Sequence, residues 1–188
     1  MAAAKANNCL SYWRAAASCI MGFFGFLRVS EVTALRMSDL KFTFKTIEIN
    51  VRTAKRRPDG FQAIIALDNI FASFVEEFWS KYNIPYSSQF SCFPQITGNK
   101  FKPLAAGTIQ KDLKSLMRLL NMPLRHFAFH SCKLGGTTKA TEAGINTSDI
   151  VDMGHWRSRG MVDRYSRAST NRLSALSKQI CDDSFDMT

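Results

Sequence analysis

The segment Gly25-Phe26-Leu27-Arg28-Val29-Ser30-Glu31-Val32 places an arginine and a glutamate directly after a long apolar run. That run, from about Cys9 to Leu27, contains no proline, and its apolar residues cover nearly the whole circumference of a helix. This pattern predicts a helix buried in the core. A single arginine at such a helix end is usually a surface charge or a salt-bridge partner. The following residues, Ser30 to Leu35, predict a short helix that Ser30 could cap.

The composition around this segment is that of a globular and strongly basic chain. Of its 188 residues, 46% are hydrophobic, which is enough for one domain with a sizeable core. There are 25 Lys and Arg against 15 Asp and Glu, so the net charge is +10. A charge of this size attracts polyanions, and nucleic acid is the first candidate. The alternative is a basic protein whose charge serves solubility or a membrane surface.

The cysteines and the apolar run exclude several other classes of protein. The five cysteines are odd in number, widely scattered and without a CxxC pair, which favours a reduced intracellular compartment over a disulfide or metal framework. The run from Ala15 to Leu27 is 13 residues long, short of the roughly 20 that span a bilayer. Charged residues follow it directly and no cleavage site is present, so we interpret the run as a buried helix.

The rest of the chain predicts further helices and one hairpin. Two β-branched and apolar runs, Thr46 to Val51 and Phe61 to Leu67, flank the turn Pro58-Asp59-Gly60 and predict a β-hairpin with a basic tip. Residues 84–103 hold three of the five prolines and predict mostly loop. Helices are expected at residues 68–82, 108–120, 131–143, 148–153 and 170–180. On the helix at 108–120, Lys111, Lys114 and Arg118 form a stripe that faces either phosphate or solvent.

Two further motifs follow the first in the sequence. One is His130-Ser131-Cys132-Lys133-Leu134-Gly135-Gly136. The other is Met153-Gly154-His155-Trp156, and Tyr165 follows ten residues after His155. Each motif is weak by itself, because a single histidine is more often structural than catalytic. The three motifs in this order are specific.

With these motifs, residues 15–167 resemble the catalytic domain of tyrosine recombinases, the phage-integrase family. The family pattern is G-[FL]-R-x-x-E, a hairpin lysine, H-x-x-R, G-[HW], and a tyrosine about nine residues further on. The resemblance implies an α+β fold, mostly helical with a small antiparallel β-sheet, which is the fold of DNA breaking-rejoining enzymes. We therefore expect residues 1–188 to form a single catalytic domain without the N-terminal DNA-clamping domain of such enzymes, and residues 168–188 to form a tail helix.

The resemblance also assigns the site residues. The catalytic residues it implies are Arg28, Lys55, His130, Lys133, His155 and Tyr165, with Glu31 in support. Tyr165 would attack a phosphodiester and form a 3′-phosphotyrosine, with His130 as general base or proton shuttle. Arg28 and His155 would stabilise the negative charge of the transition state, and Lys55 would protonate the departing 5′ oxygen. Arg56 and Arg57 stand directly beside Lys55 and leave the register of this lysine open.

The implied partner is double-stranded DNA, bound by a homo-oligomer, most simply a tetramer. The residues expected to bind DNA are Arg56, Arg57, Lys111, Lys114 and Arg157. No cofactor, metal or membrane is expected. His126 and His130 are four residues apart, but no carboxylate lies near them in the sequence to complete a metal site. The expected location is with DNA inside the cell, in a prokaryotic cytoplasm or nucleoid or in a eukaryotic nucleus.

The sequence departs from the family pattern at Lys133, where the second arginine is expected. Lysine keeps the charge but loses the planar two-pronged donor of arginine. The first hypothesis is therefore a recombinase or integrase that cleaves and rejoins DNA. The alternative is a degenerate relative that binds DNA with weak or no cleavage. A third hypothesis is a basic helical nucleic-acid-binding module in which Tyr165 is only a packed aromatic residue.

Overall fold

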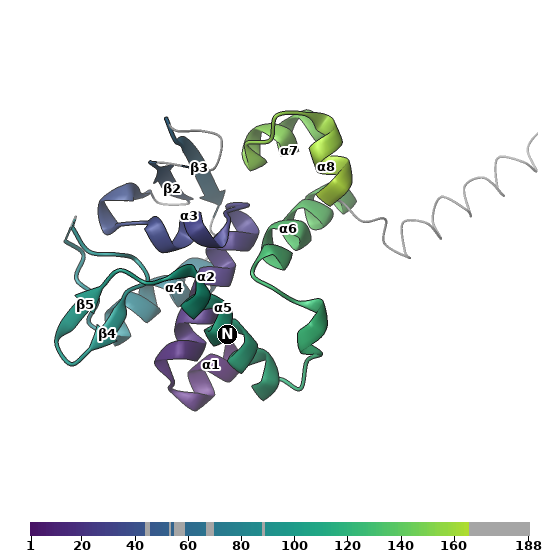
Figure 1. The fold of residues 1–188 in the computed structure, drawn as a ribbon. Helices are drawn as coiled ribbons and strands as arrows, with labels where there is room; N and C mark the ends of the chain where they lie inside the picture. Colours follow the sequence, from purple (N-terminus) through teal and green to yellow (C-terminus); the bar gives the residue numbers. More distant parts are fainter. Residues whose placement is uncertain (44–45, 53, 55–58, 67–69, 88, 166–188) are drawn as a thin grey trace, which may run out of the picture. The chain divides into compact units, whose positions relative to one another are not determined.

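The computed structural model describes residues 1–43, 46–52, 54, 59–66, 70–87 and 89–165, without the side chains of Ala72, His126, Arg164 and Tyr165 (Figure 1). The chain divides into two compact units, the first from Met1 to Lys133 and the second from Leu134 onward. The tail helix predicted at residues 168–188 lies outside the described residues.

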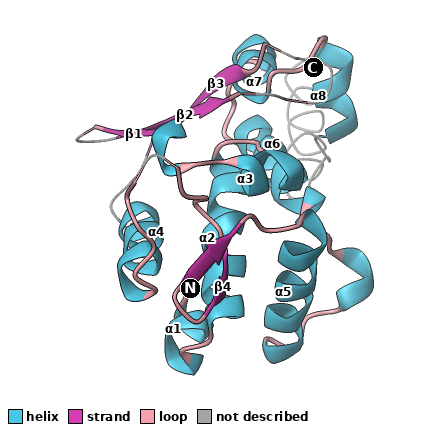
Figure 2. Ribbon diagram, turned by 60° about the vertical axis from the view of Figure 1, so that its left-hand side comes forward, coloured by secondary structure: helices cyan, strands magenta, loops and turns pink. Residues whose placement is uncertain are grey.

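Helix α2 (Leu10–Phe24) is the centre of the first unit. Its buried positions lie on all its faces, as the apolar run in the sequence predicts. Helices α1 (Ala2–Asn7), α3 (Val29–Ala34), α4 (Ile70–Lys81) and α5 (Ala106–Leu119) all contact it. Figure 2 shows α2 with α4 and α5 on either side. The predicted core helix is confirmed, and it is the element around which the unit packs.

Aromatic stacking and one buried ion pair join α2 to its neighbours. Trp13 stacks on Phe74 of α4, with ring centroids 4.7 Å apart. On another side, the Arg14 guanidinium contacts Asp112 of α5 at 2.7 Å and donates to the carbonyl of Pro94 at 2.9 Å. Burial raises the pKa of Asp112, and the charge and hydrogen bonds of Arg14 oppose this rise. Removing either partner would leave the other charge buried and unpaired. The ion pair therefore holds α5 against α2.

A three-stranded antiparallel sheet follows α3. Its strands are β1 (Leu40–Phe42), β2 (Thr46–Val51) and β3 (Phe61–Ala66), in the order β1-β2-β3. Ile47 pairs with Ile65, and both side chains are buried. Gly60, with φ 72°, closes the β2–β3 connection, and a Cβ there would lie 2.1 Å from the carbonyl oxygen of Val51. The predicted hairpin is confirmed, whereas β1 was not predicted because three residues give no readable alternation.

The described part of residues 84–103 is mostly loop, as predicted, but it is not entirely irregular. It contains a second antiparallel hairpin, β4 (Gln95–Thr97) and β5 (Lys100–Lys102). Its tip includes Gly98 at φ 57°, a backbone conformation that glycine adopts without steric cost. Each of these strands is only three residues long and consists mostly of exposed polar residues, so any alternation of apolar and polar positions is too short to predict a strand.

The second unit contains most of helix α6 (His130–Glu142), followed by α7 (Thr147–Gly154) and α8 (Arg159–Tyr165). Asn146 caps α7, since its side-chain oxygen accepts a hydrogen bond from the Ser148 backbone N–H at 2.9 Å. Helices α7 and α8 contact each other. Helix α8 was not predicted, because it is short and its residues show no clear apolar period.

Candidate active site

Arg28 lies at the end of a tight turn between α2 and α3. Helix α2 ends at Phe24, and Phe26 follows with φ 50°, the left-handed region. This conformation is unusual for a bulky residue. The Phe26 side chain is buried at 4% exposure, so core packing supports the turn. The backbone that carries Arg28 is therefore held in place by the core.

Glu31 holds Arg28 in two ways. Its Oε2 accepts a hydrogen bond from the Arg28 backbone N–H at 2.6 Å, and its Oε1 contacts the Arg28 Nη1 at 2.7 Å. Arg28 is thus the residue that precedes α3, and the prediction that Ser30 caps this helix is wrong, because Ser30 lies within its first turn. Glu31 is 2% exposed, whereas the Arg28 side chain is 30% exposed. The buried carboxylate orients a guanidinium that still reaches solvent.

The start of α6 is fixed from two sides. The Gln110 side-chain oxygen on α5 accepts a hydrogen bond from the Phe129 backbone N–H at 2.8 Å. Phe129 is buried at 1% exposure, and a Cβ built on Gly22 of α2 would lie only 2.8 Å from its ring. Helix α2 and the chain at Phe129 therefore approach so closely that only glycine fits at residue 22. His130 and Lys133 follow directly in the first turn of α6.

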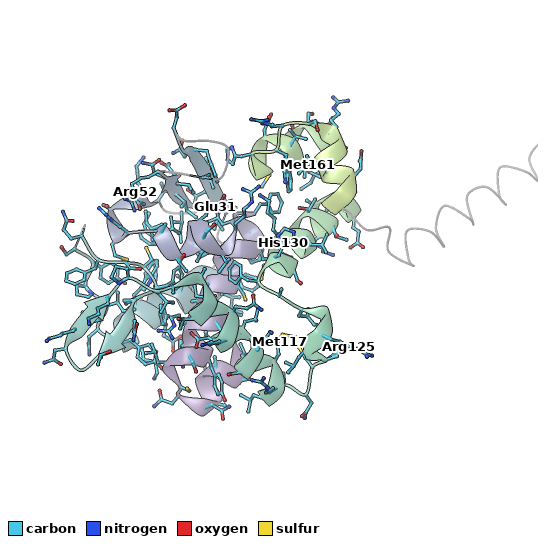
Figure 3. The ribbon with its side chains drawn as sticks, viewed as in Figure 1. Glu31, Arg52, Met117, Arg125, His130 and Met161 are labelled. Atoms are coloured by element: carbon cyan, nitrogen blue, oxygen red, sulfur yellow. The ribbon has the colours of Figure 1, made fainter. Side chains whose placement is uncertain are left out.

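The charges of Arg28, Glu31, His130 and Lys133 act on one another. Lys133 is 1% exposed, and its pKa is lowered to about 8, first by burial and then by the charge of Arg28, while Glu31 opposes the change. Burial also lowers the pKa of His130, and the charges of Lys133 and Arg28 lower it further. Figure 3 shows the positions of Glu31 and His130. The first unit thus gathers these four predicted site residues into one cluster.

In the second unit, the Met-Gly-His-Trp motif forms the end of α7. A Cβ on Gly154 would lie 2.1 Å from the ring of Trp156, so this position requires glycine. His155 has φ 50° and ends the helix, with its backbone N–H donating to the carbonyl of Asp152 at 3.2 Å. Trp156 is buried at 4% exposure. The turn therefore fixes His155 between two packed residues.

The remaining predicted residues have mixed outcomes. Lys55, Arg56 and Arg57 lie outside the described residues. Tyr165 is the last residue of α8, and its side chain is not described. Lys111 and Lys114 are exposed on α5 together with Arg118, so the predicted stripe exists on the surface. Arg157 is also exposed. His126 belongs to a separate 3-10 helix, Leu124–His126, so it does not share a helix with His130.

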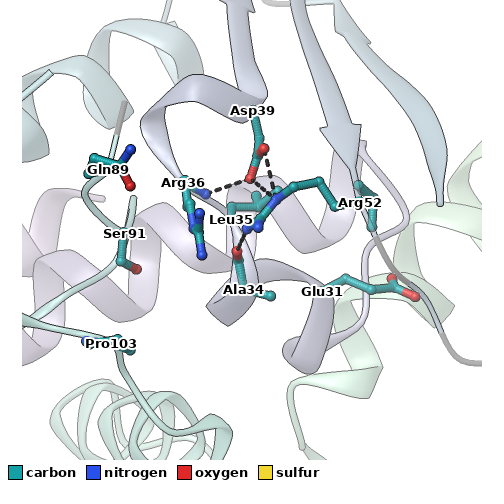
Figure 4. A pocket seen from close by; sticks show the side chains of 10 residues that line it. Glu31, Ala34, Leu35, Arg36, Asp39, Arg52, Gln89, Ser91 and Pro103 are labelled. Atoms are coloured by element: carbon teal, nitrogen blue, oxygen red, sulfur yellow. Dashed lines mark hydrogen bonds and ion pairs between the residues drawn. The ribbon is translucent and has the colours of Figure 1, made fainter. Parts of the chain in front are cut away.

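A pocket of about 390 Å³ lies between the C-terminal end of β2 and the segment that follows α3 (Figure 4). Glu31 lines it, and so do Asp39 and Arg52, which form an ion pair at 3.0 Å. Arg52 also donates to the carbonyl of Ala34 at 2.7 Å. These contacts tie the end of β2 to the segment that follows α3. The sequence did not single out Asp39, Arg52 or Gln110, because their roles come from contacts between distant segments.

The sequence profile of the Phage integrase family matches residues 1–172, and the chain belongs to this family. Among solved structures, it is similar to XerA recombinase, with a TM-score of 0.72 and 15% identity over 94% of this chain and 58% of that one. It is similar to XerH site-specific recombinase in a post-cleavage complex with palindromic difH substrate. The TM-score is 0.68 and the identity 14%, and the match covers 94% of this chain and 46% of that one. It also resembles a lambda integrase dimer bound to a COC′ core site. The TM-score is 0.55 and the identity 14%, and the match covers 84% of this chain and 53% of that one.

These comparisons confirm the predicted fold class, a mostly helical domain with small antiparallel sheets like that of tyrosine recombinase catalytic domains. The chain spans 46–58% of the length of these three structures. No curated protein sequence matches it. Within the described residues, no helix is both long enough and apolar enough to cross a membrane.

Proposed function

We propose that this chain is the catalytic part of a site-specific DNA recombinase or integrase that cleaves and rejoins strands through a 3′-phosphotyrosine intermediate. The observation that carries the proposal is the cluster in which Arg28 and buried Lys133 act on one carboxylate, Glu31, and on His130. Burial and the charge of Arg28 lower the pKa of Lys133, so the charged ammonium is disfavoured while the site holds no anion. A bound phosphodiester would reverse this effect, so the cluster is suited to an anion.

The proposed chemistry begins with Tyr165, whose hydroxyl attacks the phosphorus while the 5′ oxygen departs. Partial burial and the neighbouring charges lower the pKa of His130, which favours its neutral form, and a neutral imidazole can accept the tyrosine proton. Lys55 would protonate the 5′ oxygen as it leaves. The phosphotyrosine preserves the energy of the broken bond, so a second 5′ hydroxyl can displace Tyr165 without ATP.

The transition state carries extra negative charge on its non-bridging oxygens. Arg28, Lys133 and His155 would supply the hydrogen bonds that stabilise this charge. Glu31 contacts Nη1 and so leaves the other guanidinium N–H groups of Arg28 for a phosphate. Lys133 offers a point charge where arginine would offer a bidentate pair.

Double-stranded DNA is the proposed substrate. The net charge of +10 favours it, and Lys111, Lys114 and Arg157 are exposed as phosphate contacts require. Arg56 and Arg57 would add contacts at the hairpin tip. Two of the similar structures are described as DNA complexes, and one of these contains a dimer. We further propose that the active form on DNA is a homo-oligomer, a tetramer in the simplest case.

A nicked suicide substrate tests the activity. Wild-type protein should form a covalent protein–DNA band on a denaturing gel, and Tyr165→Phe should form none while binding DNA with nearly unchanged affinity. The affinity is retained because one hydroxyl contributes little to an interface with many phosphates. If the wild type and Lys133→Arg both bind DNA but never form the band, the degenerate DNA-binding alternative becomes the better description.

A further inference from the structure

Two cysteine thiols meet beside the candidate active site. Cys19 lies on α2, and Cys132 lies in the first turn of α6, next to Lys133. Both are free thiols, and their side chains are hydrogen-bonded to each other. The proposed strand cleavage uses neither of them. A pair of nucleophilic thiols therefore lies next to His130 and Lys133 without a role in that chemistry.

The contact between the two thiols is part of a close helix approach. Gly22 lies three residues after Cys19, on the same face of α2. A Cβ built on Gly22 would lie 3.3 Å from the Cβ of Cys132 and 2.8 Å from the ring of Phe129. The first turn of α6 therefore rests directly on this face of α2. Cys132 is held where Cys19 can reach its sulfur.

The two thiols differ in acidity. The hydrogen bond from Cys19 lowers the pKa of Cys132. The same contact, together with burial, raises the pKa of Cys19 well above its usual range. The thiolate is the form that reacts with oxidants, so of the two thiols Cys132 is the one expected to react first. Cys19 is then in place to resolve the oxidised product. Both residues keep part of their surface exposed to solvent.

We propose that Cys132 and Cys19 form a site of reversible oxidation by peroxides. The Cys132 thiolate attacks one peroxide oxygen, the O–O bond breaks, and Cys132 becomes a sulfenic acid as hydroxide leaves. The Cys19 sulfur then attacks the sulfenic sulfur and releases water, which forms the Cys19–Cys132 disulfide. Overall, two thiols lose two electrons and two protons, and hydrogen peroxide becomes two molecules of water. A dithiol reductant restores both thiols by exchange.

The consequence for activity rests on the proposed function. The two sulfur atoms must move from hydrogen-bonding distance to bonding distance, which draws the first turn of α6 toward α2. His130 and Lys133 belong to that turn and would move with it. Misplacement of catalytic groups by about 1 Å can cost roughly 10²-fold in rate. Oxidation should therefore switch off strand cleavage while leaving the exposed DNA-contacting lysines in place.

The chemical part of the proposal is tested without any activity assay. The full chain is treated with hydrogen peroxide and digested without reductant, and the peptides are analysed by mass spectrometry. A linked peptide containing Cys19 and Cys132 should appear in the wild type and be absent from Cys132→Ser. In Cys19→Ser, the sulfenic acid of Cys132 should persist and be trapped by dimedone. No linked peptide in the wild type, or links through Cys9, Cys92 or Cys181 instead, would overturn the proposal.

The functional part is tested with the nicked substrate. Peroxide should lower the rate of adduct formation by the wild type about 10²-fold. Dithiothreitol should restore that rate, and Cys132→Ser should resist peroxide. A fully linked protein that still cleaves at the original rate would contradict the effect on activity. If no variant cleaves DNA before oxidation, the proposed recombinase function fails, whereas the peptide result still decides the oxidation site.

Discussion

At the scale of single residues, Lys133 is the position that distinguishes this chain from its family pattern. On the proposed function, replacing it with arginine would add a second charge-assisted hydrogen bond to the phosphate. Such a bond at a transition state is worth about 2–4 kcal/mol, or roughly 10²–10³ in rate. We expect Lys133→Arg to raise the single-turnover rate of adduct formation and Lys133→Ala to lower it, both with little change in DNA affinity. An arginine variant no faster than wild type would mean that the site is already adapted to lysine.

The lowered pKa of Lys133 also predicts how the rate of adduct formation depends on pH. The lowered pKa of about 8 means that Lys133 is a cation below that pH and loses its charge above it. The second-order rate of adduct formation reports the free protein, so for the wild type it should fall as the pH rises through about 8. Lys133→Arg stays charged and should lack this fall. An identical decline in both proteins would assign it to another group.

The ionisation of Lys133 should also make the free energy of unfolding rise with pH, in the range where the rate of adduct formation falls. Between about pH 8 and 10.5, the unfolded chain holds the Lys133 proton and the folded chain does not. The unfolded state then binds more protons, so the free energy of unfolding rises with pH across this window. The gain relative to Lys133→Met should reach about 3 kcal/mol. Urea denaturation of both proteins at pH 7 and pH 10 measures it, and parallel behaviour would contradict the burial of a charged amine.

At the scale of elements, Gln110 links α5 to the start of α6. Gln110→Leu removes the acceptor of the Phe129 N–H, and an unsatisfied buried N–H costs about 1–3 kcal/mol. Because His130 follows directly, the rate of adduct formation should fall more than DNA affinity does. Gln110→Glu keeps an acceptor and should recover much of the rate. If both variants lose only stability and keep the rate, Gln110 has no part in positioning His130.

The elements also show what the sequence could predict and why. The long apolar run of α2, the periodic helix α4 and the β2–β3 hairpin were predictable, because their burial imposes a pattern on many residues. The three-residue strands β1, β4 and β5 were not, since so few residues carry no period. The motif residues Arg28, Glu31, His130 and Lys133 were found through the family pattern. Gln110, Asp39 and Arg52 were missed, because their contacts join segments far apart in the chain.

At the scale of the whole molecule, the stripe on α5 makes a separate prediction about DNA binding. A lysine that contacts phosphate releases a counterion, so each one removed lowers the salt slope by about 1. Lys111→Gln with Lys114→Gln should therefore lower the slope of log affinity against log salt by about 2. Lys5→Gln, an exposed lysine paired with Glu77, is the control and should have little effect. An unchanged slope in the double variant would mean that the stripe faces only solvent.

We propose above that this member of the phage integrase family attacks DNA with Tyr165. The most direct measurement is to trap the covalent complex on a nicked substrate, digest both protein and DNA, and locate the attached nucleotide by mass spectrometry. We expect a nucleotide joined through its 3′ phosphate to the peptide that contains Tyr165, and no such peptide from Tyr165→Phe. A nucleotide attached to any other residue, or an adduct that survives in Tyr165→Phe, would contradict this proposal.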